Sequence, residues 1–107
     1  MSFQFDVYRN PSEKTKVLQP YIMVIQHDYY DDLSTRLIVP FGYRGHSTRY
    51  YHQATPRINI EFQSLFMNTP GITSVEKKRL RREHFVCNLK TARPDLIAAL
   101  DALITNT

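Results

Sequence analysis

The sequence predicts a small antiparallel β-barrel or β-sandwich that ends in a single α-helix. Two observations lead to this prediction. Many short segments rich in β-branched and aromatic residues follow one another between turns. Only the last segment repeats its apolar residues at helical spacing. The length of 107 residues suits one domain, so we expect residues 1–107 to form a single unit.

Three strands are predicted in the first part of the chain. Phe3–Tyr8 alternates apolar and polar residues, which is typical of a strand with one buried face. Tyr21–Gln26 is almost continuously apolar, which indicates a strand buried on both faces. Leu37–Val39 is a shorter strand, and we expect Pro40 to end it.

More strands are predicted after a long loop. Residues 42–56 form this loop of about 15 residues, a length that favours function or mobility in so small a domain. Arg57–Phe62 alternates again, and Leu65–Met67 is its expected hairpin partner. Ile72–Val75 is one more candidate strand. The charged residues 76–83 fit either a strand edge or one helical turn.

The last segment predicts an α-helix that packs on the core. Alanines between its large apolar residues add helix propensity, and Pro94 is acceptable in a first turn. Asp95 suits the amino-terminal end of the helix dipole, and Thr91 is the better capping residue before it. The apolar stripe that we expect to pack consists of Leu96, Ile97, Leu100, Leu103 and Ile104.

Composition excludes several classes of protein. With 42% hydrophobic and 22% charged residues, the chain resembles a globular domain and not a disordered or fibrous one. No apolar run reaches the ~18 residues of a membrane span, and Asp6 and Glu13 interrupt a signal peptide. Cys87 is the only cysteine, so an intramolecular disulfide and a four-cysteine zinc site are excluded. We expect a cytoplasmic protein with no cofactor or metal, in which Cys87 is a small buried hydrophobe.

The charge is unevenly distributed along the chain. Residues 41–93 carry ten basic and three acidic side chains, whereas the segments before and after them are net acidic. This basic centre predicts an acidic partner, either nucleic acid or an acidic peptide. Its densest part fits a docking surface for an acidic peptide, a solvated edge that blocks aggregation, or a phosphate contact. These residues are Lys77, Lys78, Arg79, Arg81 and Arg82.

Seven short motifs occur in order along nearly the whole chain. They are Gln4–Tyr8, Pro20–Tyr21, Gln26–Asp28, Thr35–Pro40, Ile58–Ile60, Ile72–Val75 and Ala98–Ile104. This ordered set resembles the CcdB family of bacterial toxins. The resemblance implies a CcdB/Kid-type fold, which is an SH3-like antiparallel β-barrel with a small accessory sheet and a C-terminal helix.

The resemblance also implies a function. Members of the family are homodimeric toxins of type II toxin–antitoxin systems, and they carry out no chemistry of their own. They bind the A subunit of DNA gyrase and either inhibit supercoiling or trap the cleaved-DNA complex. A CcdA-like antitoxin neutralises them through a flexible tail. We therefore expect no enzyme activity, no membrane partner and no sequence-specific nucleic-acid binding.

Residues matching the gyrase contact of the family define a candidate site. Its centre is the segment after the helix, where Thr105 lacks the large aromatic surface that relatives often carry. Asn106 replaces a glycine, and asparagine is the next-best residue in a left-handed helix cap. The whole set is Gln4, Phe5, Tyr8, His27, Tyr29, Asp101, Thr105, Asn106 and Thr107. The five basic residues at 77–82 are the candidate site for the antitoxin tail.

Two other functions remain open from the sequence. One is an endoribonuclease toxin on the same barrel, which needs a base, an acid and a cation at the phosphate. The long loop supplies those residue types in Arg44, His46, Arg49 and His52, although the same loop also suits a protein contact. The other is a non-toxic relative that still binds its antitoxin.

Overall fold

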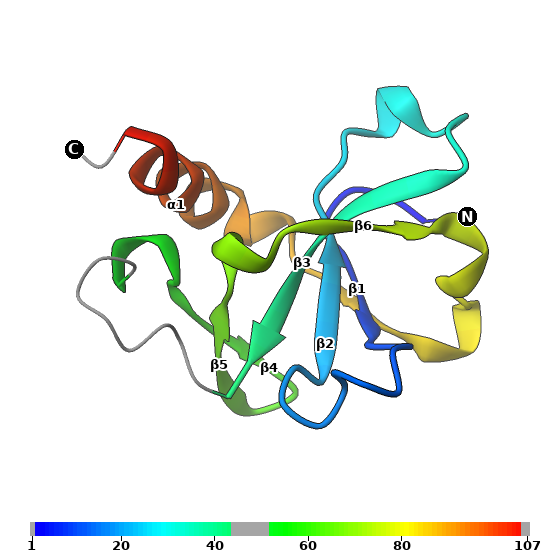
Figure 1. Ribbon diagram of the computed structural model, residues 1–107, viewed down its shortest axis with the longest axis horizontal. Coiled ribbons are helices and arrows are strands. Elements are labelled where there is room, and N and C mark those ends of the chain that lie inside the picture. The colour runs from blue at the N-terminus through cyan, green and yellow to red at the C-terminus, as the bar shows by residue number, and fades with distance from the viewer. Residues whose placement is uncertain (1, 44–51, 106–107) are drawn as a thin grey trace.

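The computed structural model describes residues 2–43 and 52–105, and it is mainly β with one C-terminal helix (Figure 1). A curled antiparallel sheet forms most of the molecule, which confirms the predicted fold class. Among the described residues, no helix has the length and apolarity that crossing a membrane requires. The strands are β1 (Asp6–Arg9), β2 (Tyr21–Val24), β3 (Thr35–Gly42), β4 (Arg57–Ile60), β5 (Gln63–Met67), β6 (Thr73–Glu76) and β7 (Phe85–Asn88), and the helix is α1 (Arg93–Thr105).

The strands join in the order β4-β5-β3-β2-β1-β7, and β6 pairs with β3 beside this path. All of these pairs are antiparallel. The β4–β5 hairpin agrees with the alternating pattern of the sequence and turns through only two residues, since Ile60 is opposite Gln63. β3 is the central strand because it pairs with β2 on one side and with both β6 and β5 on the other.

Pro40 does not end its strand, so that prediction was wrong. β3 continues to Gly42, and Pro40 is opposite Ile22 of β2. On its other side β3 pairs with β6 up to Ile38 and with β5 from Phe41. Pro40 therefore lies where β3 changes partner, and its carbonyl accepts a hydrogen bond from the Asn68 amide at 2.8 Å. A proline is tolerated there because no strand partner requires its missing N–H.

β2 is buried on both faces, as its continuous apolarity predicted. Tyr21 and Met23 point into the main core, whereas Ile22 and Val24 point into a smaller cluster on the opposite face. The main core consists of Phe5, Val7, Tyr21, Met23, Val39, Phe41, Ile60, Leu65, Met67, Ala92 and Leu96. The smaller cluster consists of Tyr8, Ile22, Val24 and Ile38.

The first strand is shorter than its alternation suggested. Phe5 has a φ of 72°, a left-handed conformation that interrupts an extended strand. The Asp6 carboxylate accepts a hydrogen bond from the Phe3 amide at 2.8 Å and so closes a turn just before β1. Beyond this turn the alternation holds, because Val7 and Tyr8 point into opposite clusters.

The charged segment after β6 forms two single 3-10 turns, η4 (Lys77–Arg79) and η5 (Arg82–His84). We call residues 77–84 the basic strap. β7 follows directly and was not predicted, because only four residues are extended and none of them is fully buried. Among the described residues it pairs only with β1, at the edge of the sheet.

Helix α1 is confirmed, but its cap and its packing face differ from the predictions. Thr91 lies inside another 3-10 turn, η6 (Lys90–Ala92), and does not cap α1. Leu96 and Ala99 are buried, and Leu100 and Leu103 are half-buried. Ile97 and Ile104 remain 50% and 79% exposed, since α1 lies at the margin of the core and covers it with one narrow face.

Candidate binding surfaces

Gln4 and the turn after β2 form one compact polar surface. The turn is η1 (Asp28–Tyr30), and the Asp28 carboxylate accepts a hydrogen bond from the Gln4 amide at 2.7 Å. The Gln4 side chain donates to the Ile25 carbonyl at 3.0 Å. His27 caps the turn, with its Nδ1 accepting from the Tyr29 amide at 3.0 Å. The structure therefore brings together three of the predicted gyrase-contact residues: Gln4, His27 and Tyr29.

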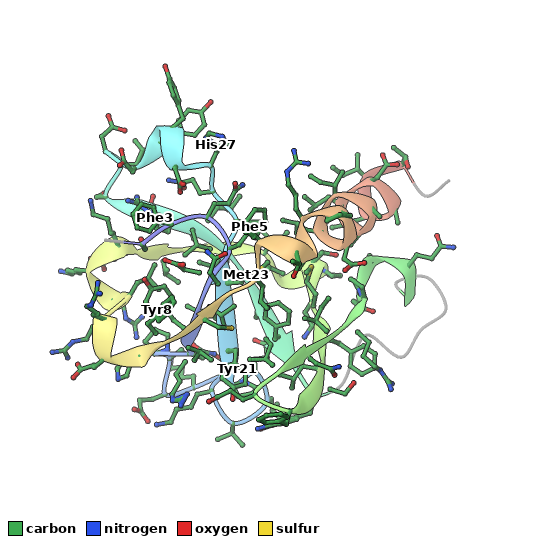
Figure 2. All side chains as sticks on the ribbon, turned by 180° about the vertical axis from the view of Figure 1, so that it is seen from behind. Phe3, Phe5, Tyr8, Tyr21, Met23 and His27 are labelled. Atoms are coloured by element: carbon green, nitrogen blue, oxygen red, sulfur yellow. The ribbon has the colours of Figure 1, made fainter. Side chains whose placement is uncertain are left out.

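Tyr29 is the most prominent group on this surface. Its side chain is 79% exposed and meets Tyr30 edge to face, with the ring centroids 5.0 Å apart. Aromatic side chains held in this way are typical anchors of protein interfaces. His27 is also exposed and projects from the same end of the molecule (Figure 2).

Phe5 and Tyr8 were predicted as contact residues, but both rings are buried. Phe5 is 6% exposed in the main core, and Tyr8 is 3% exposed in the smaller cluster. Figure 2 shows both beneath the surface that carries His27. Phe5 packs inside the main core, whereas Tyr8 also lines a small cavity beside Phe85. That either residue contacts gyrase stays a prediction.

The other predicted contact residues lie on α1. Asp101 and Thr105 are exposed, and the Thr105 hydroxyl donates to the Asp101 carbonyl at 2.7 Å. In both views α1 and η1 project from the same upper side of the molecule, but toward opposite ends of its long axis, as two separate projections (Figures 1 and 2). The predicted contacts Asn106 and Thr107 lie outside the described residues. We call Gln4, His27, Tyr29, Asp101 and Thr105 the terminal face.

Sequence reasoning missed two apolar residues beside this face. Ile97 and Ile104 line a shallow groove on α1 together with Asp101, and the prediction had assigned both isoleucines to the core. Their spacing of seven residues places them on one side of the helix. Only the position of α1 relative to the sheet decides that this side faces solvent.

The basic strap does not present its five predicted residues on one surface. Lys78, Arg79 and Arg81 line one cleft. Arg82 lines a different cavity on the far side of the strap. Lys77 lies in a third recess, where its Nζ donates to the Asp31 carbonyl at 3.4 Å. The two 3-10 turns produce this division, because successive side chains of a tight turn point in different directions.

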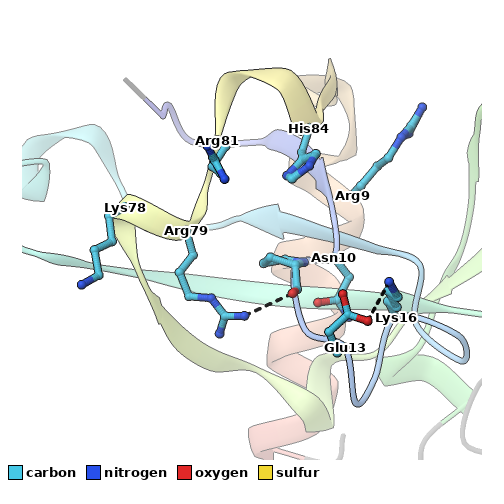
Figure 3. A pocket seen from close by; sticks show the side chains of 9 residues that line it. Arg9, Asn10, Glu13, Lys16, Lys78, Arg79, Arg81 and His84 are labelled. Atoms are coloured by element: carbon cyan, nitrogen blue, oxygen red, sulfur yellow. Dashed lines mark hydrogen bonds and ion pairs between the residues drawn. The ribbon is translucent and has the colours of Figure 1, made fainter.

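The first of these sites, which we call the basic cleft, lies between the strap and the loop after β1 (Figure 3). Its volume is about 620 Å³. Five cationic side chains and one carboxylate line it, so its potential is positive. The sequence did not predict that Arg9, Lys16 and His84 join the strap residues here. The lining residues are Arg9, Asn10, Pro11, Glu13, Lys16, Lys78, Arg79, Arg81 and His84.

The second site is a smaller aromatic cavity of about 320 Å³. Phe3 and Phe85 are about half exposed at its edge, and Phe85 meets Tyr8 edge to face with ring centroids 5.8 Å apart. Burial, reinforced by the nearby Asp6 carboxylate, raises the pKa of Tyr8. Leu80 and Arg82 complete the cavity.

The ribonuclease alternative depends on residues of the long loop, and the structure does not test it. Arg44, His46 and Arg49 lie outside residues 2–43 and 52–105, and His52 begins a 3-10 turn. The described residues contain no group of three metal-ligating side chains. Cys87 packs against the main core and is half-buried, and this burial raises the pKa of its thiol.

Comparison with known proteins gives one informative result. No curated protein matches the chain significantly. The family model described as CcdB protein matches residues 4–106, which is nearly the whole sequence and includes both the terminal face and the basic strap. The chain therefore belongs to the CcdB family, a family of toxins of toxin–antitoxin systems.

Proposed function

We propose that this protein is a toxin that inhibits DNA gyrase by binding its A subunit through the terminal face. The match to the CcdB family over residues 4–106 carries the proposal. The exposure of His27, Tyr29 and Asp101 supports it, because these positions match the family's contact residues.

Binding alone accounts for the proposed inhibition. A protein that binds one conformation of gyrase more tightly than the others shifts the enzyme toward that conformation and stops its cycle. A homodimer presents two copies of the terminal face and so suits a target with two-fold symmetry. No bond is made or broken in this mechanism, and the site of action is the cytoplasm.

Neutralisation by a CcdA-like antitoxin is part of the proposal. The basic strap is the proposed docking region for an acidic tail, because it carries five of the fourteen lysines and arginines of the chain. It lies apart from α1 in Figure 1, so an antitoxin tail held on the strap leaves the α1 part of the terminal face to be covered by another part of the same antitoxin.

A supercoiling assay with purified gyrase tests the gyrase part of the proposal. We expect the wild-type protein to inhibit supercoiling or to accumulate cleaved DNA. Tyr29→Ala should weaken the effect by ~30-fold or more, as loss of an interface anchor does. Tyr43→Ala is the matched control, since Tyr43 is also exposed but is not part of the terminal face. Absence of inhibition and of cleaved DNA at micromolar wild-type protein would contradict the proposal.

A further inference from the structure

The recess that contains Lys77 also contains a buried arginine. Its volume is about 280 Å³, and it is lined by Ser2, Asp31, Arg36, Lys77 and Leu80. Residues from three distant parts of the sequence therefore meet here, and we call this site the Arg36 recess. It is separate from the basic cleft, because the two sites have no lining residue in common.

Arg36 is buried in this recess without a negatively charged partner. It is 2% exposed, yet its guanidinium forms no ion pair among the described residues. Its hydrogen bonds go to neutral oxygens, namely the carbonyls of Asp31, Leu33 and Thr35 and the hydroxyl of Ser2. A buried charged side chain is normally paired, because the protein interior stabilises a charge less well than water does. The positive charge of Arg36 is therefore not neutralised within the described structure.

A second cation converges on the same point. Lys77 Nζ donates to the Asp31 carbonyl at 3.4 Å, and Arg36 Nη2 donates to that same carbonyl at 2.8 Å. Lys77 also forms no ion pair within residues 2–43 and 52–105. Two like charges that share one neutral acceptor repel each other, and the burial of Arg36 reduces the screening of this repulsion by salt. An anion between the two cations removes the repulsion.

The recess also holds hydrogen-bond donors that the protein itself does not use. A guanidinium has five N–H groups, and Arg36 makes four hydrogen bonds in the described structure, so one N–H is left for a ligand. The Ser2 hydroxyl accepts from Arg36 Nε at 3.2 Å, and its own proton has no acceptor among the residues that the structure describes. Several donors around two cations suit an oxyanion, which accepts several hydrogen bonds at once.

We propose that the Arg36 recess binds a small free oxyanion of the phosphate or sulfate type. Arg36 and Lys77 supply the positive charge, and the Ser2 hydroxyl supplies a further hydrogen bond. The bound anion links the N-terminal segment, the loop after η1 and the start of the basic strap, and it therefore stabilises the folded state. The site is independent of the function proposed above, because it needs neither gyrase nor an antitoxin.

Two features of the recess limit what it binds. Asp31 is a lining residue with a negative charge, so the lining carries only one net positive charge and we expect a dissociation constant in the millimolar range. The volume of about 280 Å³ is below the roughly 300–1,000 Å³ of pockets for larger organic ligands. The recess therefore suits an inorganic anion better than a nucleotide.

Titration of the ¹⁵N-labelled protein with inorganic phosphate, followed by NMR, tests the proposal. Each phosphate sample is matched by a sodium chloride sample of equal ionic strength, so that general screening affects both alike. We expect the amide signals of Asp31, Arg36 and Lys77 to shift and to saturate in phosphate only. Phosphate should also raise the Tm above its value in chloride. Shifts that do not saturate, or that are equal in chloride, would overturn the proposal.

Two adjacent lysines provide a variant and its matched control. Lys77→Gln removes one cation of the recess and should weaken phosphate binding by ~5-fold or more. Lys78→Gln removes the same charge one residue later, where the side chain is 81% exposed and lines the basic cleft, and it should weaken binding by less than ~2-fold. Both lysines are exposed, so circular dichroism should show both variants folded. Equal weakening, or weakening in Lys78→Gln alone, would mean that phosphate binds elsewhere and that the proposal is wrong.

Asp31→Asn should change the affinity in the opposite direction. It removes the carboxylate but keeps the carbonyl that Arg36 and Lys77 share, so phosphate should bind ~3-fold or more tightly. Weaker binding by this variant would contradict the assignment. AMP is the final probe, and it should bind more weakly than phosphate because its nucleoside does not fit the recess. Tighter binding of AMP would contradict the proposal of a small free anion.

Discussion

At the scale of single residues, Arg36 holds the loop that follows the turn carrying Tyr29. Arg36 is 2% exposed, and its guanidinium donates to the carbonyls of Asp31 and Leu33, each at 2.8 Å. It also donates to the Thr35 carbonyl at 3.0 Å and to the Ser2 hydroxyl at 3.2 Å. The planar guanidinium of arginine carries five N–H donors on three nitrogen atoms, so one side chain can satisfy all of these acceptors. A lysine has a single nitrogen atom and cannot reach all of them.

We therefore predict that Arg36→Lys lowers the free energy of unfolding by about 1–3 kcal/mol, because it leaves buried carbonyls without donors. Urea denaturation measures this change. Arg93→Lys, at an exposed position on α1, is the control and should change stability by less than about 0.5 kcal/mol. Equal stability of the two variants would show that the Arg36 network contributes nothing.

Tyr21 couples the core to the surface through Glu61. Its hydroxyl donates to the Glu61 carboxylate, which also pairs with Arg9. Burial, together with this hydrogen bond and the negative charge of Glu61, raises the pKa of Tyr21 to about 12 from the ordinary 10.0. The folded state therefore holds the phenolic proton more tightly than the unfolded state does.

A pH dependence of stability follows from this raised pKa. The contribution of Tyr21 is fully present below pH 10 and is lost as the pH rises toward about 12, because the unfolded chain releases the proton first. We predict a fall in the free energy of unfolding over this range, with a shallower fall in Tyr21→Phe. Chemical denaturation at several pH values measures both slopes, and equal slopes would contradict the assignment.

At the scale of elements, the β4–β5 hairpin contains a strained turn. Glu61 and Phe62 form its two-residue loop, and both have positive φ, 50° and 65°, without being glycine. Positive φ at both positions matches the twist of antiparallel strands but strains residues with a side chain. The strain persists at Glu61 because Tyr21 and Arg9 hold its carboxylate. Phe62 is fully exposed and has no comparable contact in the described structure.

We predict that Phe62→Gly raises the free energy of unfolding by up to about 1 kcal/mol. Relief of roughly 1–2 kcal/mol of left-handed strain outweighs the roughly 0.5–1 kcal/mol that glycine adds to the entropy of the unfolded chain. Thermal denaturation measures the gain. Phe62→Ala keeps the backbone strain and removes only an exposed ring, so the stability of this control variant should stay near that of the wild type. A gain in Phe62→Ala as large as the gain in Phe62→Gly would refute the strain argument.

At the scale of the whole molecule, α1 and the sheet share one core. Leu96 of the helix packs in the same cluster as Phe5 of the first loop and Leu65 of β5. These residues are distant in the sequence, so the core closes only when the C-terminal helix has docked. The helix thus contributes to stability with one face and leaves Ile97 and Ile104 exposed on the other.

Substitutions on the two faces of α1 test this division. We predict that Leu96→Ala lowers the free energy of unfolding by about 2–4 kcal/mol, because it removes buried methyl groups and leaves a cavity. Ile97→Ala, one residue later on the exposed face, should lower it by less than about 1 kcal/mol. Urea denaturation of the purified variants compares them. Equal losses would mean that Ile97 is covered in solution.

The sequence alone determined the fold class, the β4–β5 hairpin, the two-sided burial of β2 and the terminal helix. Each of these depends on local periodicity, and periodicity is a property of adjacent residues. The ordered motifs likewise pointed to the CcdB family, and the family match over residues 4–106 confirmed it.

Only the tertiary structure decided the rest. Pro40 continues a strand because β3 changes partner at that point, and β7 exists because β1 offers it an edge. The five basic residues of the strap appeared equivalent in the sequence, yet two 3-10 turns divide them among three sites. Arg9 and Lys16 join the basic cleft across more than sixty residues of chain. Such relations depend on contacts between distant segments, which no local pattern encodes.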